Sequence, residues 1–187
     1  MELARASGHH AAGLLTDLAK ACEHVDHGKL AQFAVSTGFP RDALGLCLSA
    51  DGGPRRFVNH GLCAAWFSVG GQTIIAGCGV ATALRKVYTL RLFDALSRWH
   101  PHVELHVDVG DVDLCAARAS PRQAADRLSG ATKLLLQVFD DVLQMQVAFQ
   151  KCVLLASSSH VDGHLRTNLR SNGRSFAELG GKARGAV

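Results

Sequence analysis

Two aspartates, Asp17 and Asp108, stand where carboxylates can carry chemistry together. Asp17 follows the short apolar run that begins at Gly13, and Asp108 lies in a segment in which apolar and polar residues alternate. If adjacent antiparallel strands bring the two side chains to one edge of a sheet, they can hold two Mg²⁺ ions about 3.5–4 Å apart. Such a pair of ions activates an attacking hydroxyl and stabilises a leaving pyrophosphate, which is the chemistry of nucleotidyl transfer.

The elements that must position these acids follow from hydrophobic spacing and from turn residues. Helical spacing indicates helices, alternation indicates strands, and Gly110 marks a hairpin turn. The expected elements are a strand over 13–18, a turn and helix over 19–37, a helix over 41–49, one or two strands over 56–69, a glycine-bearing loop and long helix over 74–97, a hairpin over 103–114, a helix from Pro121 to about Leu143, and a strand over 147–156. This order predicts an α+β fold with an antiparallel sheet backed by helices.

Composition sets the expected boundaries and the classes that are excluded. The chain has 187 residues, of which 48% are hydrophobic and 19% charged, so we expect one globular domain and no extensive disorder. Residues 1–12 are expected to be a loose start, and residues 157–187 a loose basic tail rich in Ser, Gly and Arg.

Targeting signals and metal-binding spacings are missing from the sequence. No apolar run approaches the roughly 18 residues of a membrane span, and the start has no secretory pattern, so we expect an intracellular protein, nuclear or cytoplasmic. The six cysteines form no C-x-x-C pair, which argues against a structural zinc site or a disulfide framework. The net charge of +4 is compatible with a phosphate-bearing partner but is shared by many enzymes. Nothing in the sequence fixes an oligomeric state.

The stretch from Asp17 to His27, D-L-A-K-A-C-E-H-V-D-H, resembles the first palm motif of retroelement reverse transcriptases, D-L-S-K-A-F-D-x-V-x-H. Cys22 stands where that family has an aromatic residue, and Glu23 stands where it has Asp. The resemblance implies that Asp17 is a metal ligand and that Leu18 and Cys22 lie at the nucleotide.

Residues 71–84, G-Q-T-I-I-A-G-C-G-V-A-T-A-L, resemble the motif P-Q-G-x-x-x-S-P, a glycine loop that enters a helix beneath the incoming nucleotide. Gly77 is retained, whereas the glutamine before it is replaced by Ala76 and the serine after it by Cys78. The resemblance implies nucleotide contacts at Gly77 and Cys78. An ordinary helix that starts at a glycine is the alternative.

The segment H-V-D-V at residues 106–109 resembles the hairpin motif Y-x-D-D. It has His106 in place of the aromatic residue, keeps the first acid as Asp108 and has Val109 in place of the second. We favour this register, because the first acid is the principal metal ligand in the family that the segment resembles. A shifted register, D-V-G-D, would supply Asp111 instead, so the expected metal ligands are Asp17, Asp108 and Asp111. The alternative is a polar hairpin face made of Asp108, Asp111 and Asp113 that holds no metal.

Lys151 lies in a segment, Q-K-C-V-L-L, that resembles the K-T or K-S strand after the second palm helix of the same family. The resemblance implies that Lys151 lies near the nucleotide phosphates and takes part in catalysis with Asp17 and Asp108. A solvated lysine at a sheet edge is the alternative.

The four motifs follow the family's order, and the resemblance, which implies a palm-like domain, extends over about residues 13–156. They imply a palm-like domain of an RNA-directed DNA polymerase that uses two Mg²⁺ ions, an RNA or DNA primer–template and deoxynucleotides. Only 16 residues precede Asp17, nothing after Ser157 resembles a helical thumb, and one hairpin acid is missing. Two hypotheses therefore stand, a fragment of a reverse transcriptase and an inactive palm-like remnant that binds nucleic acid or another partner. For the isolated chain we expect negligible polymerase activity.

Overall fold

The computed structural model describes residues 8–68, 70–108, 110–171, 174–175 and 182–184. The chain divides into two compact units, unit 1 formed by Met1–Ala19 with Leu92–Val187, and unit 2 formed by Lys20–Arg91. The region expected to form one domain over 13–156 is therefore shared between two units, and each is described by itself.

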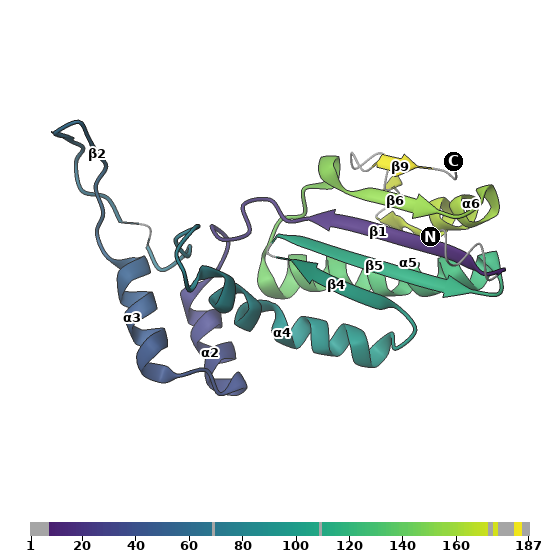
Figure 1. Cartoon of the computed structure of the whole chain (residues 1–187), viewed down its shortest axis with the longest axis horizontal. Coiled ribbons are helices and arrows are strands. Elements are labelled where there is room, and N and C mark those ends of the chain that lie inside the picture. Colours follow the sequence, from purple (N-terminus) through teal and green to yellow (C-terminus); the bar gives the residue numbers. More distant parts are fainter. Residues whose placement is uncertain (1–7, 69, 109, 172–173, 176–181, 185–187) are drawn as a thin grey trace. The chain divides into compact units, whose positions relative to one another are not determined.

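Unit 1 is built on a five-stranded sheet with the strand order β4-β5-β1-β6-β9 (Figure 1). The strands are β1 (His10–Asp17), β4 (Glu104–Asp108), β5 (Asp111–Arg118), β6 (Val153–Ala156) and β9 (Lys182–Arg184). β1 is antiparallel to both β5 and β6, β4 is antiparallel to β5, and β6 is parallel to β9. The strand that carries Asp17 is thus flanked by strands from the second half of the chain.

Helices α5 (Pro121–Gln137) and α6 (Ser159–Asn168) lie against one face of this sheet, behind it in Figure 1. α5 continues as a π-helical segment, η1 (Val138–Leu143). The strands bury alternate side chains on this face, Ala12, Leu14 and Thr16 from β1 and Val112, Leu114 and Ala116 from β5. Because strand side chains alternate between faces, the intervening residues, Asp17 among them, lie on the face that α5 and α6 leave uncovered. We call this the open face.

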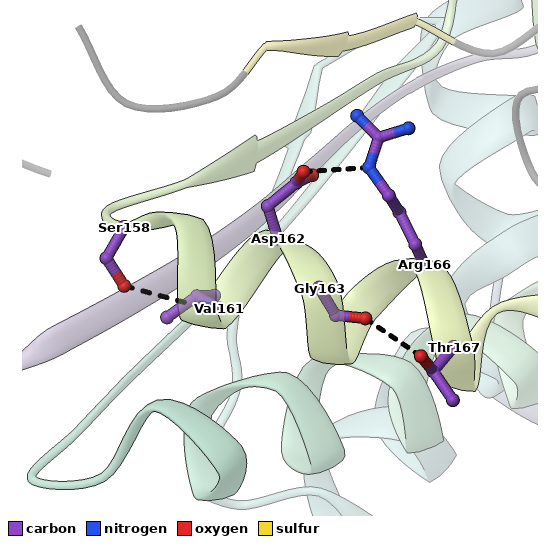
Figure 2. A network of polar contacts seen from close by, with 6 residues as sticks. All are labelled: Ser158, Val161, Asp162, Gly163, Arg166 and Thr167. Atoms are coloured by element: carbon purple, nitrogen blue, oxygen red, sulfur yellow. Dashed lines mark hydrogen bonds and ion pairs between the residues drawn. The ribbon is translucent and has the colours of Figure 1, made fainter.

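Helix α6 occupies a segment that the sequence predicted to be loose. Its first turn is capped by Ser158, whose hydroxyl accepts a hydrogen bond from the backbone N–H of Val161 (Figure 2). Asp162 and Arg166 form an ion pair of 2.7 Å one turn apart on the helix surface. The Ser- and Gly-rich composition suggested a loose segment. Serine, however, also serves as a helix cap, as Ser158 does here.

Replacing Ser158 by alanine is expected to destabilise unit 1 by about 0.5–1 kcal/mol, because the first turn of α6 loses its side-chain cap. Urea denaturation followed by circular dichroism measures the change. Ser159→Ala is the matched control, since Ser159 is exposed at the first helical position and should leave the midpoint nearly unchanged. Equal effects of the two substitutions would contradict a capping role for Ser158.

Unit 2 contains α2 (His27–Thr37), α3 (Arg41–Gly52), the two-residue strands β2 (Val58–Asn59) and β3 (Leu62–Cys63), and the first part of α4 (Ala81–Trp99). The Asp26 side chain caps α2 by accepting a hydrogen bond of 2.7 Å from the Lys29 N–H. Gly38 ends the helix with a φ of 72°, a left-handed conformation that glycine adopts without strain.

Several expected boundaries shift in the structure. β1 begins at His10 rather than Gly13. The strand expected over 147–156 is limited to β6, and it is preceded by a 3₁₀ turn, η2 (Phe149–Lys151), so Lys151 lies on a turn and not on a strand. Among the described residues, no helix is both long enough and apolar enough to cross a lipid bilayer.

Candidate functional site

Three aspartates form a row across three neighbouring strands at one end of the open face. In the strand register Asp17 of β1 is directly opposite Asp111 of β5, and Asp111 is directly opposite Asp108 of β4. Side chains of directly opposite residues lie on the same face with Cβ atoms about 4.5–5.5 Å apart. We call these three residues the carboxylate row.

The order of the strands corrects one expectation about the acids. The sequence suggested that adjacent strands would bring Asp17 and Asp108 together, but β5 lies between their strands. With strands spaced about 4.8 Å apart, the backbones at Asp17 and Asp108 are separated by about 10 Å. Asp111, the acid of the less favoured register, is the direct neighbour of Asp17. Val109, which replaces the second acid of the motif, lies outside the described residues.

Backbone hydrogen bonds on both sides hold the end of β1 in place. The Leu18 N–H donates to the Gly110 carbonyl in the hairpin turn at 3.2 Å, and the Asp17 carbonyl accepts from the Ala148 N–H at 2.8 Å. The Ala19 N–H donates to the Gln146 carbonyl at 2.8 Å. Asp17 is therefore positioned by the hairpin on one side and by the segment before η2 on the other.

Lys151 contacts the carboxylate row directly. Its Nζ lies 2.6 Å from Oδ2 of Asp17, while the lysine side chain stays largely exposed and that of Asp17 is about one-fifth exposed. The hydrogen bond to Asp17 raises the pKa of Lys151, and the charges of Asp17 and Asp111 add to this shift. The ammonium group thus remains charged and neutralises part of the row.

A further acid, Asp113, lies beside the carboxylate row. Asp113 of β5 is opposite His106 of β4 and opposite Leu15 of β1. Partial burial raises the pKa of Asp113, the negative charge of Asp111 raises it further, and His106 opposes the shift. The sequence had placed Asp113 only on a possible metal-free hairpin face, and His106 only in the position of an aromatic residue.

The donor atoms of the carboxylate row suit a hard cation. Carboxylate oxygens are the ligands that Mg²⁺ and Mn²⁺ prefer, whereas zinc and copper sites use nitrogen and sulfur. In the described part of the chain, no three His, Cys, Asp or Glu side chains converge as a ready-made metal site. The row therefore offers fitting donors, but its side chains must turn toward one another and Asp17 must release Lys151 before they can share an ion.

The residues expected at the nucleotide are divided between the units. Leu18 belongs to unit 1, and its side chain is buried. Cys22, Gly77 and Cys78 belong to unit 2, where Gly77 and Cys78 are exposed and Gly77 has a φ of 82°, a conformation that favours glycine.

Unit 2 brings the first motif beside the start of the glycine loop. The carbonyl of Cys22 accepts a hydrogen bond of 2.9 Å from the Ile74 N–H. The Thr73 N–H donates to the Val25 carbonyl, and the His27 N–H donates to the Gly71 carbonyl. Two of the four motifs are thus linked through their backbones.

The sheet, helices and acids of unit 1 together define a class of fold. Unit 1 has a largely antiparallel sheet, two helices on one face, and acids at the end of its central strand and of the neighbouring hairpin. This is an α+β fold of the polymerase-palm type.

Comparison with known proteins supports that class at the level of fold. No protein-family model and no curated protein sequence matches the chain. Among solved structures, the chain is similar to an apo telomerase from Candida tropicalis truncated from its C-terminal domain, with a TM-score of 0.60 and 11% sequence identity. The match covers 79% of this chain and 31% of the telomerase chain. At this identity the likeness concerns the fold alone, and the chain spans less than a third of that relative.

Proposed function

We propose that this chain carries the palm of a reverse-transcriptase-like nucleotidyltransferase of retroelement origin. The observation that carries the proposal is the carboxylate row, three acids from two sequence motifs at one end of one sheet face. The similarity in fold to a telomerase supports the same class. An RNA or DNA primer–template and deoxynucleotides are the partners that follow from this proposal.

In this proposal the carboxylates of Asp17, Asp111 and Asp108 would hold Mg²⁺. Bound Mg²⁺ would supply the polarisation of the attacking hydroxyl and the neutralisation of the leaving pyrophosphate. Asp17 is held at the strand end by hydrogen bonds of the backbone, so the protein's own contribution is to fix the backbone position of this ligand before an ion arrives. Lys151 would release Asp17 and turn its ammonium group to the phosphates of the nucleotide.

A cation titration tests the proposal. Binding of Mn²⁺ to the full chain, used as a paramagnetic substitute for Mg²⁺ and followed by electron paramagnetic resonance, is expected to weaken at least about tenfold in Asp17→Asn and in Asp111→Asn, because each variant removes a charged ligand. Asp42→Asn is the matched control, since Asp42 is an exposed acid in the first turn of α3, and it should bind Mn²⁺ as the unaltered chain does. Unchanged binding in both row variants would refute the proposal.

The ion pair between Lys151 and Asp17 favours a second candidate, a palm-like remnant without catalysis that binds nucleic acid. In such a protein Lys151 takes the place of the metal ion and neutralises Asp17 permanently. An unaltered chain that binds Mn²⁺ no better than its Asp17→Asn variant, yet still binds an oligonucleotide, would support this candidate over the first.

A further inference from the structure

A second surface with the means to bind a ligand lies in unit 2, on a hairpin that the four motifs leave unassigned. Arg55 and Phe67 close its base with two backbone hydrogen bonds of 2.8 Å, and β2 and β3 form its arms. The two residues at its tip, His60 and Gly61, both have positive φ values, 47° and 83°. These values match a type I′ turn, the tight turn that fits the twist of a hairpin. We call residues 55–67 the aromatic hairpin.

The aromatic hairpin exposes large apolar side chains. Phe57 is 73% exposed and Trp66 is 63% exposed, while the rings of Phe57 and Phe67 stack with centroids 5.3 Å apart. The guanidinium carbon of Arg56 lies 5.0 Å from the centroid of the Trp66 ring. Large apolar side chains gathered on an exposed element indicate a contact surface for a ligand.

The charge of the sequence segment that contains the aromatic hairpin helps to select the kind of ligand. From Gly52 to Arg91 the sequence has no Asp and no Glu in 40 residues, but five basic residues, Arg55, Arg56, Lys86, Arg91 and the buried Arg85. A partner rich in negative charge is favoured by such a segment. The partner must also offer flat apolar groups that can stack on exposed rings, and unpaired bases on a phosphate chain meet both requirements.

We propose that the aromatic hairpin binds single-stranded nucleic acid, with bases stacked on Trp66 and Phe57 and phosphates paired with Arg56. The proposal goes beyond the proposed function, because it assigns a binding surface outside the carboxylate row and holds even if the chain binds no metal. Stacking tolerates any base, so the binding is independent of sequence. It weakens with added salt, because bound phosphates release counterions.

The test measures fluorescence anisotropy of a labelled oligothymidylate with the full chain in the presence of EDTA, which removes any contribution of metal at the carboxylate row. Trp66→Ala is expected to weaken binding at least about fivefold, and Trp66→Phe should retain most of it, because a ring remains for stacking. Trp99→Ala is the matched control, since Trp99 is 68% exposed on α4 and is the only other tryptophan. This variant should bind as the unaltered chain does.

Intrinsic fluorescence gives an independent readout. In Trp99→Ala the remaining tryptophan is Trp66, so added oligonucleotide should quench its emission, whereas Trp66→Ala should show no comparable quenching. Equal affinities of Trp66→Ala and Trp99→Ala would overturn the proposal. Dimerisation through the aromatic hairpin would also overturn the proposal. It would be seen if Trp66→Ala lost self-association while its oligonucleotide binding stayed unchanged. Because Trp66 is exposed, its replacement should not alter the circular dichroism spectrum.

Discussion

Replacing Leu14 by alanine is expected to destabilise unit 1 by about 2–5 kcal/mol, the range found when a fully buried leucine is cut back to alanine. Leu14 is 0% exposed in the central strand, directly opposite Leu114 on one side and Leu154 on the other. The substitution leaves a cavity between the sheet and the helices that cover it. Since whole domains are stable by about 5–15 kcal/mol, a large share of the stability would be lost. Urea denaturation followed by circular dichroism measures it.

The adjacent residue provides the control for Leu14. Leu15 has the same side chain but lies on the open face and is 39% exposed, so Leu15→Ala should cost less than about 1 kcal/mol. The comparison also tests the placement of Asp17, which shares the face of Leu15 because the two positions differ by two residues. If Leu15→Ala proved as damaging as Leu14→Ala, the assignment of faces along β1 would be wrong, and the carboxylate row with it.

Replacing Asp51 by alanine is expected to destabilise unit 2 by about 1.5–3 kcal/mol, because a hydrogen bond to a charged and buried acceptor is lost. Asp51 is 3% exposed near the end of α3, and its Oδ1 accepts a hydrogen bond of 3.1 Å from the Ile75 N–H in the glycine loop. Its carbonyl also accepts from the Arg55 guanidinium at the base of the aromatic hairpin. The alanine variant leaves the Ile75 N–H without its side-chain acceptor.

Amide hydrogen exchange measures this effect at the residue concerned, since the Ile75 amide should exchange faster in Asp51→Ala than in the unaltered chain. Asp51→Asn is the matched variant, because its amide oxygen can still accept the hydrogen bond and only the charge is lost. It should therefore cost less than half as much as alanine. A free energy of unfolding for Asp51→Ala within about 0.5 kcal/mol of the unaltered chain would show that Asp51 does not support the loop.

Strongly periodic segments could be predicted from the sequence. Helical spacing located α4, and Pro121 located the start of α5. Alternation around Gly110 located the hairpin of β4 and β5. The α+β class with helices backing an antiparallel sheet is confirmed, because each of these patterns depends on local spacing alone.

Segments whose structure depends on distant partners could not be predicted in the same way. Helix α6 lies in a Ser- and Gly-rich stretch whose composition suggested a loose tail. Its two buried residues, Val161 and Leu165, are too few apolar positions at helical spacing to predict a helix. β9 is a three-residue strand that pairs with β6, and so short a segment carries no pattern of its own. Burial and pairing against the rest of unit 1 account for both elements.

The sequence by itself determined which chemical groups are available: Asp17, Asp108, Asp111 and Lys151, and a segment of unit 2 that has basic and aromatic residues but no acids. Only the tertiary structure decided which of these groups meet. It placed β5 between β1 and β4, so that Asp111 and not Asp108 is the neighbour of Asp17, and it brought Lys151 to the Asp17 carboxylate. Strand order is decided by pairing between segments nearly a hundred residues apart, because hydrogen bonds and buried side chains must be satisfied across the whole sheet at once.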